Sequence, residues 1–271
     1  MNKQLTVNRK TSAYWRVTFL NPPINLLDPD TIDELLTHMD QFETDPELKV
    51  VVFDSADPDY FIAHYDMARA GEAPKSPRAS DLPAWFEFTT RLAKSSVVSI
   101  AEIRGRARGI GSEFALACDM RFASLEKAVF GQPEVGVGIV PGGGGNEMLA
   151  RLAGRARALE IVLGADDYDA RTAERYGWIN RALPDTELGG FVDNLARRIA
   201  SFDQQALSEA KRLLNRAGLP GAPELIESRT AFLSLAATEG TRQALAKAIA
   251  QGLGKAGGFE LQLGGRLGHL G

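Results

Sequence analysis

The chain has 271 residues, with 31 Lys or Arg against 35 Asp or Glu, so its formal net charge is −4. This length suits one large domain or a domain with an appendage, and 44% hydrophobic with 24% charged residues excludes disordered, collagen-like and disulfide-stapled chains. The slightly acidic balance leaves no basic footprint, so we expect no nucleic acid and no anionic membrane among the primary partners.

Short segments rich in β-branched and aromatic residues predict strands over residues 14–20 and 49–54. A helix is expected between them, with Asp28 as its N-cap, Pro29 in its first turn and Pro46 beyond its end. Its apolar side chains recur at the i, i+3, i+4, i+7 spacing of one helix face: Ile32, Leu35, Leu36, Met39 and Phe42.

The alternation continues along the next part of the chain. Strands are predicted over residues 97–101, 120–123 and 128–131, and a helix over residues 111–118. A surface loop is expected over residues 70–81, which are rich in Pro and small residues. Alternating strands and helices predict an α/β layer, in which helices cover a sheet that cannot bury its apolar faces alone.

After the glycines at 142–145 the sequence becomes helix-forming. A soft boundary near Ser201 divides the chain into a core of residues 1–200 and a helical C-terminal region of residues 201–271. The glycine-rich tail over 254–271 lacks clear periodicity, so we expect it to be mobile or ordered only by a partner. Helices are predicted over residues 146–152, 155–163, 170–176, 191–200, 204–217 and 223–252.

Cysteine usage and the N-terminus indicate the compartment. Cys118 is the single cysteine, so no internal disulfide can form, and no Cys/His cluster has the spacing of a structural zinc site. Residues 1–10 lack the apolar core of a signal peptide, and no stretch approaches roughly 18 uninterrupted apolar residues. We therefore expect a cytoplasmic protein with no metal site and no membrane segment.

A first candidate site lies in residues 101–119, where a strand passes through small residues into a helix. The first turn of such a helix presents unpaired N–H groups and the positive end of its dipole, which can hold an anionic oxygen. Glu113 lies in that turn, where a carboxylate is favoured and could act on a bound ligand. A first-turn capping charge with no catalytic role is the alternative.

A second candidate is Glu134, which lies among glycines and apolar residues in segment 130–145. Removal from water would raise its pKa toward the range that general acid and base catalysis requires. The glycines do not form a nucleotide-binding loop, because no Gly-Lys-Ser/Thr follows and the Gly-x-Gly-x-x-Gly register is broken.

The third segment, residues 60–67, follows a strand and a polar turn, a common place for ligand contacts. His64 in this segment could act as an acid, a base or a ligand. The alternative is a hydrogen-bonded structural histidine, since no partner lies near it in the sequence.

Together, these three segments resemble the enoyl-CoA hydratase/isomerase, or crotonase, superfamily. Residues 61–66 stand where that family has Phe-x-Ala-Gly-x-Asp, and residues 107–119 match its Ala-x-Gly-x-Gly-x-Glu-x-Ala-Leu-Ala-Cys-Asp block. Residues 130–134 and 140–145 fit a third block, Phe-Gly-Gln-Pro-Glu followed by Val-Pro and four glycines. The resemblance implies an α/β fold, a crotonase-like spiral of ββα units with a C-terminal helical trimerisation region, and a homotrimer or hexamer.

The resemblance also implies a chemistry. Family members bind acyl-CoA thioesters and stabilise the enolate oxygen with two backbone N–H groups, which by motif position belong to Tyr65 and Ile110. Glu113 and Glu134 match both glutamates of the hydratases, Glu113 acting on the water and Glu134 on the proton at C2. No separate cofactor is implied, because coenzyme A enters with the substrate. The substrate-binding positions by motif are Ala63, His64, Asp66, Met67, Gly109, Pro133 and Gly142.

The chain departs from the family pattern at three places. His64 replaces a usual glycine, so its imidazole is expected to project toward the thioester or adenine side. Ile110 replaces the middle glycine of a triplet, which would narrow the acyl pocket. The C-terminus lacks the Lys-Arg-x-Pro-x-Phe ending of hydratases and has Gly-Gly-Arg-Leu-Gly-His over residues 264–269 instead.

Hydration of a 2-enoyl-CoA is therefore the favoured function. Isomerisation, thioester hydrolysis and decarboxylation are alternatives on the same fold, and a non-catalytic trimeric binding or scaffold protein is another. Arg104, Arg106 and Arg108 alternate in an extended stretch and so share a face, where CoA phosphates or solvent, rather than RNA, are the expected partners.

Overall fold

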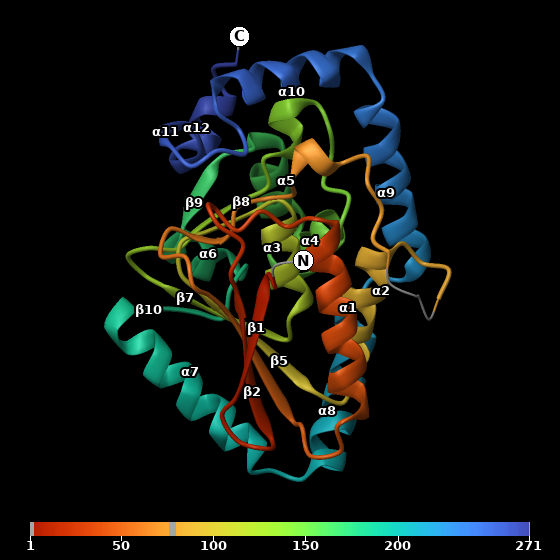
Figure 1. The fold of residues 1–271 in the computed structure, drawn as a ribbon, viewed down its shortest axis with the longest axis vertical. Coiled ribbons are helices and arrows are strands. Elements are labelled where there is room, and N and C mark those ends of the chain that lie inside the picture. Colours follow the sequence, from red (N-terminus) through yellow and green to blue (C-terminus); the bar gives the residue numbers. More distant parts are fainter. Residues whose placement is uncertain (1–2, 76–79, 271) are drawn as a thin grey trace.

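The computed structural model describes residues 3–75 and 80–270. Its larger sheet has the order β1-β2-β3-β5-β7-β10, in which β1 and β2 are antiparallel and the other neighbours are parallel (Figure 1). The strands are Leu5–Arg9 (β1), Tyr14–Phe19 (β2), Val50–Ser55 (β3), Val98–Ile103 (β5), Met120–Ser124 (β7) and Arg181–Leu183 (β10).

A second, smaller sheet has the order β4-β6-β8-β9. Strand pairs β3–β4, β5–β6 and β7–β8 each step from the larger sheet to the smaller one, and helices α2, α3 and α4 follow the three pairs. This repeat confirms the predicted spiral of ββα units. The smaller sheet's strands are Tyr60–Ile62 (β4), Arg106–Arg108 (β6), Val129–Gly131 (β8) and Asp167–Asp169 (β9).

Helices cover both faces of the larger sheet and form the C-terminal region (Figure 1). The helices of the core are Pro29–Thr44 (α1), Ala84–Lys94 (α2), Ile110–Ala117 (α3), Gly145–Leu152 (α4), Arg155–Gly164 (α5), Ala170–Tyr176 (α6) and Asp185–Ala200 (α7), with short 3₁₀ turns at Met67–Arg69 (η1) and Glu134–Val137 (η2). The C-terminal helices are Gln204–Gly218 (α8), Ala222–Ala236 (α9), Glu239–Gln251 (α10), Gly258–Leu261 (α11) and Leu263–Leu267 (α12).

Alternation along β3 builds a core on each face of the larger sheet. Val50 and Val52 pack against the α7 face, while Val51 and Phe53 point to α1 and α3, where the Phe53 ring meets Phe114 at 5.0 Å. Side chains in a strand point alternately to opposite faces, so one run of apolar residues serves both cores.

The local signals read for α1 are confirmed. The Asp28 side chain accepts a hydrogen bond from the Thr31 N–H at 2.8 Å, Pro29 is the first helical residue, and the helix ends at Thr44, before Pro46. The apolar face predicted for this helix is buried against the sheet.

Two predictions of secondary structure are wrong, and one helix had not been predicted. The segment over residues 223–252 is two helices, because α9 ends at Ala236 and Thr238 caps α10, its side chain accepting from Thr241 N–H at 3.3 Å. Helix α7 begins at Asp185 rather than 191, since Gly189 and Gly190 hid its first turns. Helix α2 had not been predicted, although Glu87, Arg91 and Lys94 recur on one face at helical spacing and most of its other residues are buried.

The tail is also not the mobile or partner-dependent segment that was expected. Phe259 and Leu263, from α11 and α12, are buried with Val137, Ile139 and Leu253 in one apolar cluster. The tail is therefore ordered by its own chain, through burial of a few apolar side chains that show no periodicity. The division of the chain at residue 200 stays a prediction.

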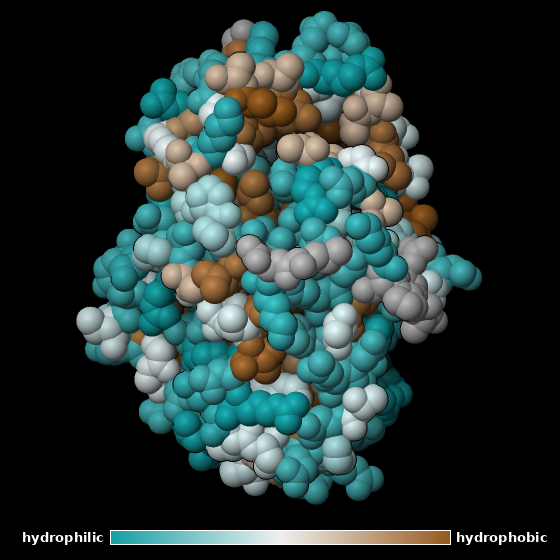
Figure 2. All heavy atoms as spheres, in the orientation of Figure 1, coloured by the Kyte–Doolittle hydropathy of each residue, from teal (hydrophilic) through white to brown (hydrophobic). Residues whose placement is uncertain are grey.

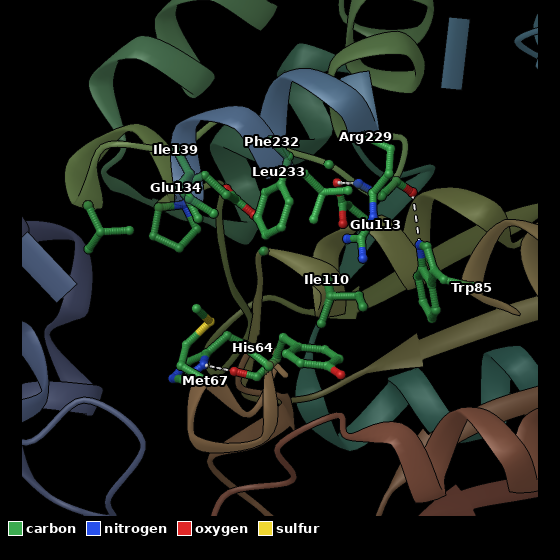
Figure 3. A pocket seen from close by; sticks show the side chains of 18 of the residues that line it. His64, Met67, Trp85, Ile110, Glu113, Glu134, Ile139, Arg229, Phe232 and Leu233 are labelled. Atoms are coloured by element: carbon green, nitrogen blue, oxygen red, sulfur yellow. Dashed lines mark hydrogen bonds between the residues drawn. The ribbon is translucent and has the colours of Figure 1, made fainter. Parts of the chain in front are cut away.

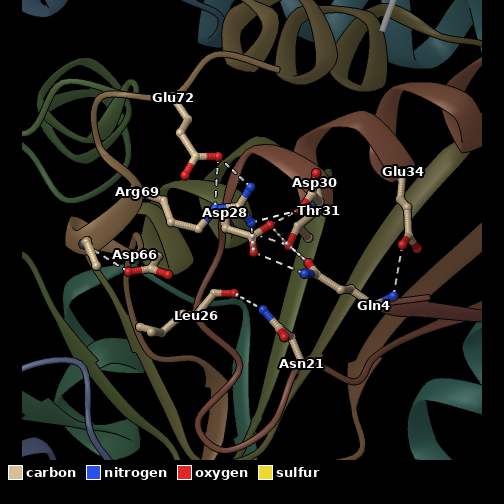
Figure 4. A network of polar contacts seen from close by, with 11 residues as sticks. Gln4, Asn21, Leu26, Asp28, Asp30, Thr31, Glu34, Asp66, Arg69 and Glu72 are labelled. Carbon is tan, nitrogen blue, oxygen red and sulfur yellow. Dashed lines mark hydrogen bonds and ion pairs between the residues drawn. The ribbon is translucent and has the colours of Figure 1, made fainter. Parts of the chain in front are cut away.

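A polar network ties the segment after β4 to the start of α1 (Figure 4). Nη1 of Arg69 donates to Asp28 at 2.7 Å and to Asp30 at 2.8 Å, while Nη2 donates to Glu72 at 2.6 Å. Residues 70–75 are loop, as predicted, and residues 76–79 of that loop lie outside the described residues. The network holds the chain that leaves the third motif segment.

Candidate active site

The three motif segments converge on one cavity of about 450 Å³. It lies among the ends of β4, β6 and β8 and beneath the C-terminal helices, and Figure 2 shows apolar side chains gathered on the surface in that region, below α10. The motif residues in its lining are His64, Tyr65, Met67, Gly109, Ile110, Glu113, Pro133, Glu134 and Gly142.

Two of the expected substrate-binding residues lie outside the cavity lining. Ala63 is fully buried, and its N–H donates to the Asn25 carbonyl at 3.2 Å. The Asp66 carboxylate caps η1 by accepting from the Ala68 N–H at 2.9 Å. Both residues shape the turn that presents their neighbours, and their assignment as substrate-binding residues stays a prediction.

Glu113 is buried at the start of α3 and bonds to the glycine run instead of its own helix. Its Oε1 accepts from the N–H of Gly143 at 2.8 Å and from that of Gly145 at 3.0 Å. Burial raises the pKa of Glu113 to about 7, although these two N–H groups and Arg229 lower it. The carboxylate thus bonds to the backbone of a distant loop rather than to its own first turn, and its catalytic role stays a prediction.

The glycine run is required by this contact. A Cβ added at Gly143 would lie 2.2 Å from Oε2 of Glu113 and 2.7 Å from Nε1 of Trp85. That indole N–H donates to the Gly143 carbonyl at 3.0 Å, so the loop is held from both sides. A side chain at this position would displace the carboxylate from the cavity.

Glu134 begins η2 and is buried against the same cavity. Burial raises its pKa well above the ordinary value, and the charge of Glu113 raises it further. Its Oε2 has no hydrogen-bond partner within the described part of the chain, and a Cβ at Gly109 would lie only 2.9 Å from its Oε1. Two buried carboxyls with raised pKa values therefore lie on one cavity, where the charge of one affects the pKa of the other.

Two unpaired backbone N–H groups also border the cavity. Leu27 bonds on both sides of Tyr65, donating to the His64 carbonyl and accepting from the Asp66 N–H, both at 2.9 Å, so within residues 3–75 and 80–270 the Tyr65 N–H has no acceptor. Ile110 is the first residue of α3, after Gly109 at φ +51°, and a first helical N–H has no acceptor within its helix.

His64 borders the cavity, but the chain itself binds both of its ring nitrogens. Nδ1 lies 2.7 Å from the Tyr65 carbonyl oxygen, and Nε2 lies 2.8 Å from Oε1 of Glu260 in α11. Burial raises the pKa of Glu260, but the hydrogen bond and charge of His64 and the N–H of Gly254 together hold it below its ordinary value. The expectation that the imidazole projects toward a thioester or adenine is wrong; the structural alternative describes it.

Replacing Glu260 by Gln is expected to lower the free energy of unfolding by about 1.5–3 kcal/mol at pH 7, as for a lost charge-assisted hydrogen bond. Because folding lowers the pKa of Glu260, its contribution is complete above about pH 4.3, the ordinary Glu value, and disappears as the pH falls through the lower folded value. Urea unfolding of the wild-type protein and of Glu260→Gln from pH 7 to about pH 3.5 measures the difference in their free energies of unfolding.

The difference between the two proteins should narrow over that acid range. Glu239→Gln is the matched control, since Glu239 pairs with Arg242 on the surface and its side chain is 66% exposed. A difference that stays constant with pH would contradict a buried ionised Glu260.

Arg106 and Arg108 share a face, as predicted, but that face meets the C-terminal tail rather than a ligand or solvent. Arg108 is fully buried and donates to Asp167 and, at 2.6 Å, to the Glu260 carbonyl. Arg106 donates to the Leu261 carbonyl at 3.1 Å, and Arg104 pairs with Asp185 at 3.0 Å. None of the three lines the described cavity, and two of them hold the C-terminal tail in place.

Side chains from distant elements complete the cavity, and the sequence did not reveal them. Trp85 comes from α2, and Arg229 and Phe232 come from α9 (Figure 3). The only signal in the sequence was the long helical run after residue 200, which does not show which helix face meets the core. In the described part of the chain, no three His, Cys, Asp or Glu residues are grouped so as to hold a metal ion.

The enoyl-CoA hydratase/isomerase family model matches residues 9–247. The chain belongs to this family. The short-chain-enoyl-CoA hydratase of Clostridium acetobutylicum is 33% identical over 202 residues, covering 74% of this chain and 77% of that protein. The crotonyl-CoA hydratase of Syntrophomonas wolfei is also 33% identical, covering 73% and 77%.

The fold of the family is equally clear among solved structures. The crystal structure of a Streptomyces avermitilis protein, proposed to be an enoyl-CoA hydratase, is 42% identical, with a TM-score of 0.96 and 99% of this chain and 98% of that chain covered. The chain is thus an enzyme of the hydratase/isomerase family. No helix within the described ranges has the length and apolar character to cross a membrane.

Proposed function

We propose that this enzyme adds water across the C2=C3 bond of a 2-enoyl-CoA. The observation that carries the proposal is a pair of buried carboxyl groups on one cavity, Glu113 with a pKa of about 7 and Glu134 with a pKa raised well above its ordinary value. Two carboxyls whose environments separate their pKa values can act as a base and an acid at the same pH.

In this mechanism the ionised Glu113 takes a proton from water while the water oxygen bonds to C3. The C2=C3 electrons move to form the enolate, whose oxygen accepts from the N–H groups of Tyr65 and Ile110. The protonated Glu134 then donates its proton to C2, and proton exchange with solvent restores both carboxyls. Loss of one such oxyanion donor costs roughly 2.7–4 kcal/mol in a well-studied protease.

The test is to mix the purified protein with crotonyl-CoA and follow the loss of the ultraviolet absorbance of the conjugated thioester, with the product mass measured in parallel. A gain of one water molecule supports the proposal. If the protein binds acyl-CoA in calorimetry but leaves crotonyl-CoA unchanged, the favoured reaction becomes isomerisation, hydrolysis or decarboxylation. If it binds no acyl-CoA, a scaffold role is favoured.

We further propose that the enzyme assembles as a homotrimer, alone or paired into a hexamer. Large apolar side chains on a C-terminal helix are exposed, with Leu214 of α8 at 76% and Leu213 of the same helix at 48%. Such residues favour association with another surface. Light scattering coupled to gel filtration tests this; a monomer over the working concentration range would reject it.

A further inference from the structure

Arg229 is a cation inside the cavity with no anionic partner in the described part of the chain. It is half-buried on α9, lines the cavity and forms neither an ion pair nor a hydrogen bond there; its contact is the ring of Phe232 at 5.1 Å. In Figure 3 its side chain extends from α9 into the cavity, toward Glu113 and Trp85. A guanidinium so placed is available to a ligand.

The carboxylates of Glu113, Glu147 and Glu72 each have at least one partner other than Arg229. Oε1 of Glu113 accepts from two N–H groups of the glycine run. Glu147 accepts from the Ser228 hydroxyl, and Glu72 pairs with Arg69 at 2.6 Å. None of these forms an ion pair with Arg229. Neutralisation of the guanidinium is therefore left to something that enters the cavity.

A second donor faces the same space. Burial raises the pKa values of Glu113 and the Tyr65 phenol, and the positive charge of Arg229 opposes the rise at each, so the guanidinium acts on both groups. The Tyr65 hydroxyl has no hydrogen-bond partner in the described ranges. Apolar side chains form much of the surrounding wall, among them Ile32, Pro83, Trp85, Phe86 and Ile110. The cavity thus offers the Arg229 and Tyr65 donors in a largely apolar lining that also holds the carboxyls of Glu72, Glu113 and Glu134.

We propose that the preferred substrate is an enoyl-CoA whose acyl chain ends in a carboxylate, with the Arg229 guanidinium and the Tyr65 hydroxyl as donors to that carboxylate. The inference rests on the proposed function and names its substrate class. A guanidinium and a carboxylate form a strong, charge-assisted pair, especially within apolar walls. A neutral acyl chain of equal length leaves the guanidinium unpaired, and a site built this way discriminates strongly against it.

Binding of unreactive analogues tests this without turnover. Calorimetry compares glutaryl-CoA with valeryl-CoA, which have equal acyl length and differ in the terminal carboxylate. The wild-type enzyme is expected to bind glutaryl-CoA at least ~10-fold more tightly. Arg229→Met should abolish the difference by weakening glutaryl-CoA alone, whereas Arg229→Lys should keep part of it. Arg242→Met is the matched control, since Arg242 is exposed on α10 and pairs with Glu239.

Equal affinities for the two thioesters in the wild-type enzyme would overturn the proposal. Equal weakening of both by Arg229→Met would overturn it as well, because the guanidinium would then serve the CoA moiety common to them. Hydration of crotonyl-CoA by the same preparations distinguishes failure of this inference from failure of the proposed function. If the enzyme hydrates crotonyl-CoA but shows no preference for glutaryl-CoA, only this inference is rejected. If it binds neither thioester, the proposed function is rejected too. Thermal unfolding of Arg229→Met verifies that it is folded.

Discussion

Replacing Glu134 by Gln is expected to lower the kcat for enoyl-CoA hydration by about 10³-fold, the size of a general acid–base contribution. An amide cannot supply the proton that C2 requires. Folding should be little affected, because the two side chains are similar in volume and Oε2 of Glu134 has no hydrogen-bond partner in the described part of the chain. The dissociation constant of a saturated acyl-CoA, such as butyryl-CoA, should therefore stay close to that of the wild-type enzyme.

Kinetics with crotonyl-CoA give kcat, and calorimetry with butyryl-CoA gives the dissociation constant. Glu147→Gln is the matched control: this carboxyl lies near the pair and raises the pKa of Glu113, but it accepts from Ser228 and does not line the cavity. Its variant should keep most of the activity. Turnover by Glu134→Gln at the wild-type rate would remove Glu134 from the mechanism.

Replacing Glu113 by Gln is expected to lower hydration by about 10²–10⁴-fold, because an amide cannot take the proton of water. The amide oxygen can still accept from the N–H groups of Gly143 and Gly145, so the loop should keep its position. The rate of double-bond isomerisation should fall much less, because that reaction needs no activated water. Parallel assays of hydration and of 3-enoyl to 2-enoyl isomerisation compare the fall in the two rates. An equal fall in both would contradict the assigned roles.

The same carboxyl predicts the acid limb of the wild-type pH profile. Since burial raises the pKa of Glu113 to about 7 and the reaction needs its ionised form, kcat/KM for hydration should fall as the pH drops through about 7. The apparent value belongs to the coupled pair with Glu134, so a profile over pH 5 to 9 reports both groups. A rate that is flat from pH 5 to 8 would show that neither group titrates in the free enzyme.

Signals between neighbouring residues predict much of the site. The Asp28 cap, Pro29 and the apolar spacing of α1 act within a few residues, so the predicted helix is correct. The glycines of 142–145 and the small residues before α3 likewise act locally, since they allow backbone to approach Glu113 and Glu134 closely. These short-range effects explain why both carboxyls could be singled out before the fold was known, whereas the N–H groups of Tyr65 and Ile110 were expected from the family motif.

Local signals also misled at several positions. His64 had no partner within reach of its own segment, because Glu260 lies in a tail whose glycines and lack of periodicity predicted disorder. Arg108 alternates with Arg106 and so predicted a shared exposed face, whereas burial of β6 places Arg108 against Asp167 and the tail backbone. In each case the missing information was a contact between segments far apart in the chain.

The sequence by itself determined the alternation of strands and helices, the start of α1 and α3, and the placement of Glu113 and Glu134 among glycines, because capping, periodicity and steric permission depend on neighbouring residues. The ββα spiral was expected only from the resemblance to the family. Only the tertiary structure decided that the tail closes over His64 and that α9 brings Arg229 to the cavity. Those contacts depend on which helix face is buried against the core, and burial is a property of the whole fold.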